Sequence, residues 1–86
     1  MKVIGQKDKN PEFTTELRRI RYSLYMTQAE FCRRSNIPLG TYKAWECGTQ
    51  FPSPGNWKIY IDFVTGLRGA EPLEKIKSIY ISCKGV

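Results

Sequence analysis

Apolar residues recur at helical spacing near the start of this chain. Phe13, Leu17, Ile20 and Leu24 stand at i, i+4, i+7 and i+11, which places all four on one face of a helix. The pattern predicts a helix that begins at residue 13 or 14 and ends at residue 24. Its apolar face should pack inward, and Arg18 and Arg19 should then point outward.

Two further apolar segments follow in the C-terminal half. Ser53 and Pro54 fit the N-cap and the first position of a helix over 54–65, and Gly66 is a typical stop signal. This helix carries more apolar residues than one face can bury, namely Trp57, Ile59, Tyr60, Ile61, Phe63 and Val64. The last segment favours a helix over 71–81, although its end also alternates in the manner of a strand, at Ile79, Ile81 and Cys83.

Between these segments, residues 27–48 predict two short helices joined by a tight turn. Thr27 and Glu30 have the spacing of a capping box, so a helix should begin at Gln28. It should end near Asn36, because asparagine tolerates the left-handed conformation that closes a helix. A second helix over 38–47 should start at proline and end at Gly48. Two helices joined in this way form a helix-turn-helix, whose second helix usually enters a DNA groove.

The inward side of these two helices can be read from the same spacing. Phe31 and Cys32 should face the core from the first, and a buried cysteine packs as a small hydrophobe. Ile37 should fill the space that the polar Ser35 leaves. In the second helix the inward residues should be Tyr42, Trp45 and Glu46.

The stretch resembles the helix-turn-helix of the Cro/CI (XRE) family of phage repressors. The residues that carry the resemblance are Thr27, Gln28, Glu30, Phe31, Cys32, Asn36, Thr41, Tyr42, Trp45, Glu46, Gly48 and Pro52. The resemblance implies an all-α, compact, five-helix, lambda-repressor-like domain. It also implies an ion pair between Arg21 and Glu46 that ties the first helix to the end of the third.

The resemblance further assigns DNA contacts. The base-facing positions would be Leu39, Gly40, Lys43 and Ala44, with Thr41 near the DNA backbone. Gln28 would touch a phosphate, which agrees with the affinity of a helix N-terminus for anions. Further candidate phosphate contacts are Thr49, Gln50 and Asn56 near the start of the fourth helix, and Arg33 and Arg34, for which simple solvation is an equal alternative.

The predicted base-facing set is unusual. Lys43 can donate to guanine, and Leu39 and Ala44 can meet thymine methyl groups, but the set lacks the Gln, Asn or Arg side chains that make bidentate base contacts. Sequence reading by this helix would then be modest, with DNA shape carrying part of the specificity. Leu39 can alternatively be an ordinary apolar residue or one that awaits a protein partner.

Composition bounds the remaining alternatives. The 86 residues carry a net charge of +6, which favours a polyanionic partner such as nucleic acid, and contain no histidine. Three cysteines without CxxC spacing fit neither a disulfide framework nor a metal site, so we expect no metal and no cofactor. No apolar run is long enough for a membrane span and no signal peptide is recognisable, so we expect a cytoplasmic protein without membrane contact.

The domain organisation expected from the sequence is simple. Residues 1–11 form either a frayed terminus or a flexible basic arm that follows a DNA groove, residues 12–82 form the DNA-binding domain, and residues 83–86 form a tail. The resemblance implies a homodimer formed by the C-terminal part. The apolar residues expected at its interface are Trp57, Tyr60, Ile61, Leu73, Ile76 and Tyr80.

The expected function is a non-enzymatic, sequence-specific regulator that binds double-stranded DNA. In its simplest form it is a homodimeric repressor of a promoter on a phage, plasmid or other mobile element. The promoter can be that of its own gene. The repressor acts by blocking access to the promoter. Two alternatives use the same fold: the antitoxin of a toxin–antitoxin pair, and a protein-interaction adaptor that has lost DNA reading. Catalysis has no support, since neither an acid–base pair nor a phosphate-binding loop is recognisable.

Overall fold

The computed structural model describes residues 10–84, with the backbone alone described at Lys84. Within this range the chain is all-helical, in the order α1 (Pro11–Ser23), α2 (Gln28–Ser35), α3 (Leu39–Cys47), α4 (Pro54–Arg68), a 3-10 turn (Glu71–Leu73) and α5 (Glu74–Lys84). The all-α prediction is confirmed at this level, and the strand alternative for the C-terminal segment is wrong. Most of the predicted N-terminal arm lies outside the described residues.

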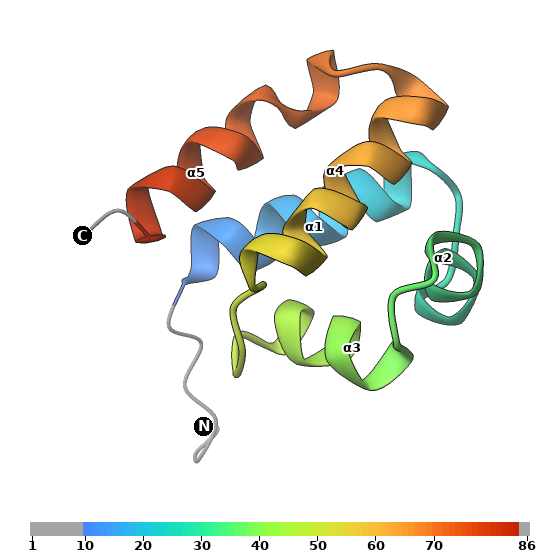
Figure 1. Ribbon diagram of the computed structural model, residues 1–86, viewed down its shortest axis with the longest axis horizontal. Helices are drawn as coiled ribbons and strands as arrows, with labels where there is room; N and C mark the ends of the chain where they lie inside the picture. The colour runs from blue at the N-terminus through green and yellow to red at the C-terminus, as the bar shows by residue number, and fades with distance from the viewer. Residues whose placement is uncertain (1–9, 85–86) are drawn as a thin grey trace.

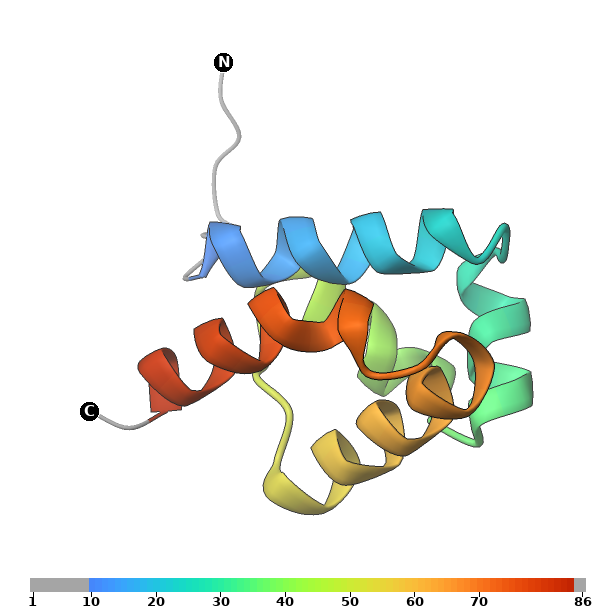
Figure 2. The ribbon, with the colours of Figure 1, turned by 90° about the horizontal axis from the view of Figure 1, so that it is seen from above.

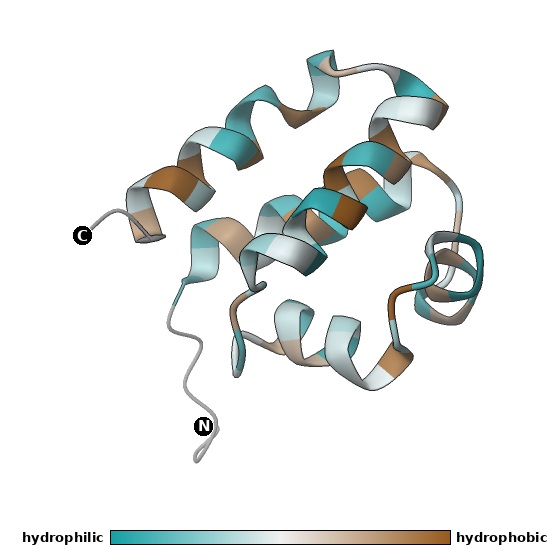
Figure 3. Ribbon diagram, viewed as in Figure 1, coloured by the Kyte–Doolittle hydropathy of each residue, from teal (hydrophilic) through white to brown (hydrophobic). Residues whose placement is uncertain are grey.

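The helices enclose one core (Figures 1 and 2). Helix α1 packs against α5 on one side and α3 on the other, while α2 packs against α3 and α4. Apolar positions recur along α1, α4 and α5 between hydrophilic ones (Figure 3). The most deeply buried large side chains are Phe13, Leu17, Ile20, Phe31, Ile37, Tyr42, Trp45, Tyr60, Val64, Leu73 and Ile76.

Helix α2 has the predicted bounds, and its ends show why. The Thr27 hydroxyl accepts a hydrogen bond from the Glu30 backbone N–H at 3.1 Å, which is one half of the expected capping box. Asn36 closes the helix in the left-handed conformation, with φ 68°. As predicted, Phe31, Cys32 and Ile37 are buried, and burial raises the pKa of the Cys32 thiol.

Helix α4 is longer than predicted. Gly66 lies inside it, and the stop falls at Gly69, which takes the positive φ of 83°. A glycine one turn before the end of a helix looks like a stop signal in the sequence, but the helix ends at the glycine that takes a positive φ, which other residues rarely adopt. Arg68 then ties this end of α4 to α1, because its Nη1 donates to the Ser23 carbonyl at 3.1 Å.

Two other boundaries differ from the prediction. Helix α1 begins at Pro11, two or three residues before the predicted start, because proline suits the first helical turn. Pro38 is the cap of α3 rather than its first residue, while Gly48 ends α3 as predicted with φ 84°. Helix α5 continues to Lys84 and so passes the expected domain boundary at residue 82.

Candidate nucleic-acid interface

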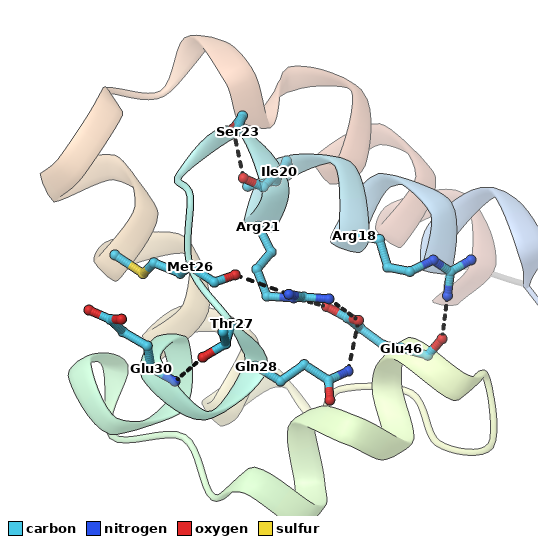
Figure 4. Close-up of polar contacts among 9 residues, drawn as sticks. All are labelled: Arg18, Ile20, Arg21, Ser23, Met26, Thr27, Gln28, Glu30 and Glu46. Atoms are coloured by element: carbon cyan, nitrogen blue, oxygen red, sulfur yellow. Dashed lines mark hydrogen bonds and ion pairs between the residues drawn. The ribbon is translucent and has the colours of Figure 1, made fainter.

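Glu46 of α3 is the centre of a buried polar network that joins three helices (Figure 4). Arg21 of α1 donates to both carboxylate oxygens, from Nε to Oε2 at 2.8 Å and from Nη2 to Oε1 at 3.0 Å. From the start of α2, Gln28 Nε2 donates to Oε1 at 2.9 Å. The side chains of Arg21 and Glu46 are 9% and 3% exposed. The expected Arg21–Glu46 pair is thus formed, and it fixes α3 against α1 and α2.

Two further bonds extend this network. Arg21 Nη1 donates to the Met26 carbonyl at 3.0 Å, which holds the turn between α1 and α2. Arg18 Nη1 donates to the Glu46 backbone carbonyl at 2.7 Å, so Arg18, which was expected to point outward, is half-buried against α3. Arg18 and Arg21 are three residues apart on α1 and share one side of it, a spacing from which this contact could have been predicted.

Opposing influences act on the acidity of Glu46. Burial by itself raises the pKa of this carboxyl, but hydrogen bonds from Arg21 and Gln28 and the positive charge of Arg21 outweigh burial and hold the pKa below its ordinary value. The buried Tyr42 hydroxyl favours the same charged form from nearby, although its geometry is not that of a hydrogen bond. Glu46 is therefore an anion in the folded protein at neutral pH.

We expect stability to fall in acid because of this carboxylate. A group whose pKa is lower in the folded state stabilises the protein above its unfolded pKa, and this contribution is lost as the pH falls through the folded pKa. The free energy of unfolding should therefore decline as the pH is lowered past about 5, and the decline should be shallower in Glu46→Gln. Urea denaturation at pH 7 down to pH 3 measures both slopes. Equal slopes would show that Glu46 is not responsible.

Glu16 should account for part of the pH dependence of stability that remains in Glu46→Gln. Its side chain is 6% exposed and pairs with Arg19 at 2.6 Å and with Lys75 at 3.6 Å. The hydrogen bond from Arg19 outweighs the effect of burial and lowers the pKa of Glu16. This cluster was not predicted from the sequence, because Glu16 and Lys75 meet only when α1 packs against α5.

The exposed side of α3 carries the predicted base-facing residues. Tyr42, Trp45 and Glu46 are buried, as expected. Gly40 and Lys43 are exposed, Leu39 is 38% exposed, and Ala44 is half-buried. Cys47 is also exposed, and Thr41 is half-buried. The structure therefore brings the four predicted base-facing residues together along one side of α3.

The predicted phosphate contacts divide into two groups. Gln28 is half-buried and donates to Glu46, while Thr49 caps the end of α3 by donating from its hydroxyl to the Ala44 carbonyl at 3.3 Å. The others lie at the surface: Arg33, Arg34 and Gln50 are exposed and Asn56 is half-buried. Arg34 pairs loosely with Glu30 in its own helix, at 3.8 Å.

The expected dimer interface needs correction. Trp57, Tyr60, Leu73, Ile76 and Tyr80 are all buried within their own chain, at 9% exposure or less, and Ile61 is partly buried against the same core. Trp57 stacks on Tyr80 with ring centroids 4.3 Å apart. The first five are therefore core residues with almost no surface to offer a second subunit, whereas Ile61 keeps part of its surface. Helical spacing identifies an apolar face but does not tell what covers it.

Comparison of the chain with protein-family models, curated proteins and solved structures found no match. Within residues 10–84, no helix is both long and apolar enough to cross a membrane. Over the same residues, no three His, Cys, Asp or Glu side chains lie together in a way that could bind a metal ion.

Proposed function

We propose that this protein is a non-enzymatic transcriptional regulator of the Cro/CI type, in which α2 and α3 form a helix-turn-helix and α3 enters the major groove of DNA. The observation that carries the proposal is the network around Glu46. It joins α3 to Arg21 of α1 and to Gln28 at the start of α2, while another side of α3 stays exposed. A reading helix needs this rigid support, because base contacts depend on its angle in the groove.

Charge supports the same function. The chain carries a net charge of +6, and Arg33, Arg34 and Lys43 are exposed on α2 and α3. Cations near the reading helix would neutralise phosphates and release bound counterions. A homodimer would present two copies of α3 to an inverted repeat, and binding across a promoter would repress by occlusion.

Selection of bound duplexes from a random DNA pool tests the proposal. We expect an inverted repeat with half-site centres about 10 bp apart, bound at least about 1,000-fold more tightly than a scrambled duplex. Lys43→Ala should weaken specific binding more than non-specific binding. Lys58→Ala, which removes an exposed lysine of α4, is the matched control. If selection yields no motif and both duplexes show one steep salt dependence, the regulator proposal fails.

A row of apolar residues on α4 favours a second candidate. Ile59 and Leu67 are 42% and 43% exposed, and the half-buried Phe63 lies between them at i+4 spacing. Such a row can bind a protein: a second copy in the regulator, or a toxin if the chain is an antitoxin with the same DNA-binding module. Co-purification of a small basic partner protein from the native host would favour the antitoxin.

A further inference from the structure

The four predicted base-facing residues on the outer side of α3 form two distinct rows. Leu39 and Lys43, four residues apart, form a row of long side chains, and Gly40 and Ala44 form a neighbouring row with almost none. The space around Gly40 is open, since a Cβ atom added there would meet nothing within 4 Å. If α3 enters the groove as proposed above, the bases can approach its backbone closely along the Gly40–Ala44 row.

The side chains of these two rows can make only a few kinds of contact with a base. Adenine is usually read by the amide of Asn or Gln, and cytosine by a carboxylate. None of the four residues of the two rows carries either group, and the only strong hydrogen-bond donor among their side chains is the ammonium of Lys43. Lys43 fits the acceptors of guanine. The other three residues offer only apolar surface or open space.

The major groove contains one apolar group that suits such a surface, the C5 methyl of thymine. We infer that α3 recognises DNA chiefly through the C5 methyl groups of pyrimidines, which pack against Leu39 and the Gly40–Ala44 row, beside a guanine that binds Lys43. This inference rests on the proposed DNA-binding function and adds the kind of base that is read.

Methyl recognition has a consequence that ordinary thymine recognition lacks. A 5-methylcytosine carries the same methyl group at the same ring position, whereas cytosine and uracil lack it. Because Leu39, Gly40 and Ala44 have no hydrogen-bonding side chain that could read the rest of the base pair, 5-methylcytosine paired with guanine should replace thymine paired with adenine at a position that they contact. Uracil should not replace thymine, although it pairs in the same way.

The experiment uses the full chain and the tightest duplex from the random-pool selection. Each thymine of a half-site is replaced singly by uracil, by cytosine and by 5-methylcytosine, with the matching base opposite, and binding is measured by fluorescence anisotropy. We expect uracil to weaken binding about fourfold at each contacted position, as for the loss of one buried methyl group. Cytosine should weaken it at least as much, and 5-methylcytosine should bind within about twofold of thymine.

A pair of protein variants assigns the effect to α3. Leu39→Ala should abolish the preference for thymine over uracil at one position of each half-site. Ile81→Ala is the control, because Ile81 is an exposed apolar side chain on α5, at 68% exposure against 38% for Leu39. It should leave the preference unchanged.

Each remaining outcome overturns the inference. If the uracil duplexes bind as tightly as the thymine duplex and still outcompete a scrambled duplex, methyl reading is excluded while the DNA-binding proposal stands. If cytosine and 5-methylcytosine weaken binding equally relative to thymine, recognition of the methyl group is also excluded. If no duplex is preferred over the scramble, the inference and the proposed function fail together.

Discussion

Replacing Glu46 with alanine should lower the free energy of unfolding by about 3 to 5 kcal/mol, because it leaves the Arg21 guanidinium buried without its carboxylate. The Arg21 side chain is 9% exposed, so water cannot take over the two hydrogen bonds that Glu46 accepts. Gln28 also loses the acceptor for its amide. Domains of this size have total stabilities of about 5 to 15 kcal/mol, so the change is a large share of the whole.

Urea denaturation followed by circular dichroism measures the loss. Asp62→Ala is the matched control, because Asp62 and Lys58 form a pair of similar length, 2.9 Å, whose side chains are 65% and 77% exposed. The control should change stability by no more than about 0.5 kcal/mol, as is usual for an exposed pair on one helix. Similar losses in the two variants would contradict the role of burial.

A double variant keeps this prediction testable even if Glu46→Ala does not fold. Arg21→Met with Glu46→Leu removes both charges and fills the space with apolar atoms. It should be more stable than either single variant, because no unpaired charge remains. If the double variant is as unstable as the two single variants, the stability depends on the Arg21–Glu46 pair itself and not on avoiding an unpaired buried charge. That result would exclude the unpaired Arg21 charge as the cause of the loss in Glu46→Ala.

The double variant also separates stability from positioning. Contacts between two apolar side chains have no preferred geometry, whereas the bidentate Arg21–Glu46 ion pair fixes one orientation of α3 relative to α1. A stable double variant with weaker specific DNA binding would therefore show that the network serves to hold the proposed reading helix at one angle.

Much of the fold could be predicted from the sequence because its signals are local. The capping role of Thr27, the stop at Asn36 and the inward side of α3 depend on residues within one or two turns of each other. Such signals act before any tertiary contact forms. The bounds of α2 and the end of α3 at Gly48 agree with them for this reason.

The features that were missed depend on which helices pack together. Tyr80 and Trp57 have apolar spacing that suits a dimer as well as a core, and only the packing of α5 decides that they are buried. Glu16 and Lys75 are far apart in the sequence, and their contact needs the same packing. The Arg21–Glu46 pair was expected only by family resemblance, since no local signal joins two residues 25 positions apart.

The candidate DNA-binding site could be predicted only in part from the sequence. Helical spacing was enough to put Leu39, Gly40 and Lys43 on the side of α3 away from the core, and all three are exposed. That DNA lies against this side remains a prediction. Spacing decides which way a side chain faces, but what it binds depends on a partner that the chain alone does not contain.

Gly40→Glu should therefore abolish specific DNA binding, with a loss of about 100-fold or more, while the fold is kept. The fold tolerates the change because the space at Gly40 is open, a glutamate in the first turn suits the helix dipole, and glycine is the poorer helix former. Binding does not, because the new carboxylate would face the bases and phosphates of the groove, where like charges cost several kcal/mol. Fluorescence anisotropy and urea denaturation measure the two effects on one sample.

Gly66→Glu supplies a control that is matched in exposure, in the open space around the glycine and in the change of net charge. Gly66 is also an exposed helical glycine with open space around it, and its replacement changes the net charge equally. It lies near the end of α4 that contacts Ser23 of α1 through Arg68, away from the outer side of α3. Its effect on DNA binding should stay below about threefold, the size of a general charge effect. Equal losses in the two variants would mean that binding depends on net charge alone, and α3 would then not be the reading helix.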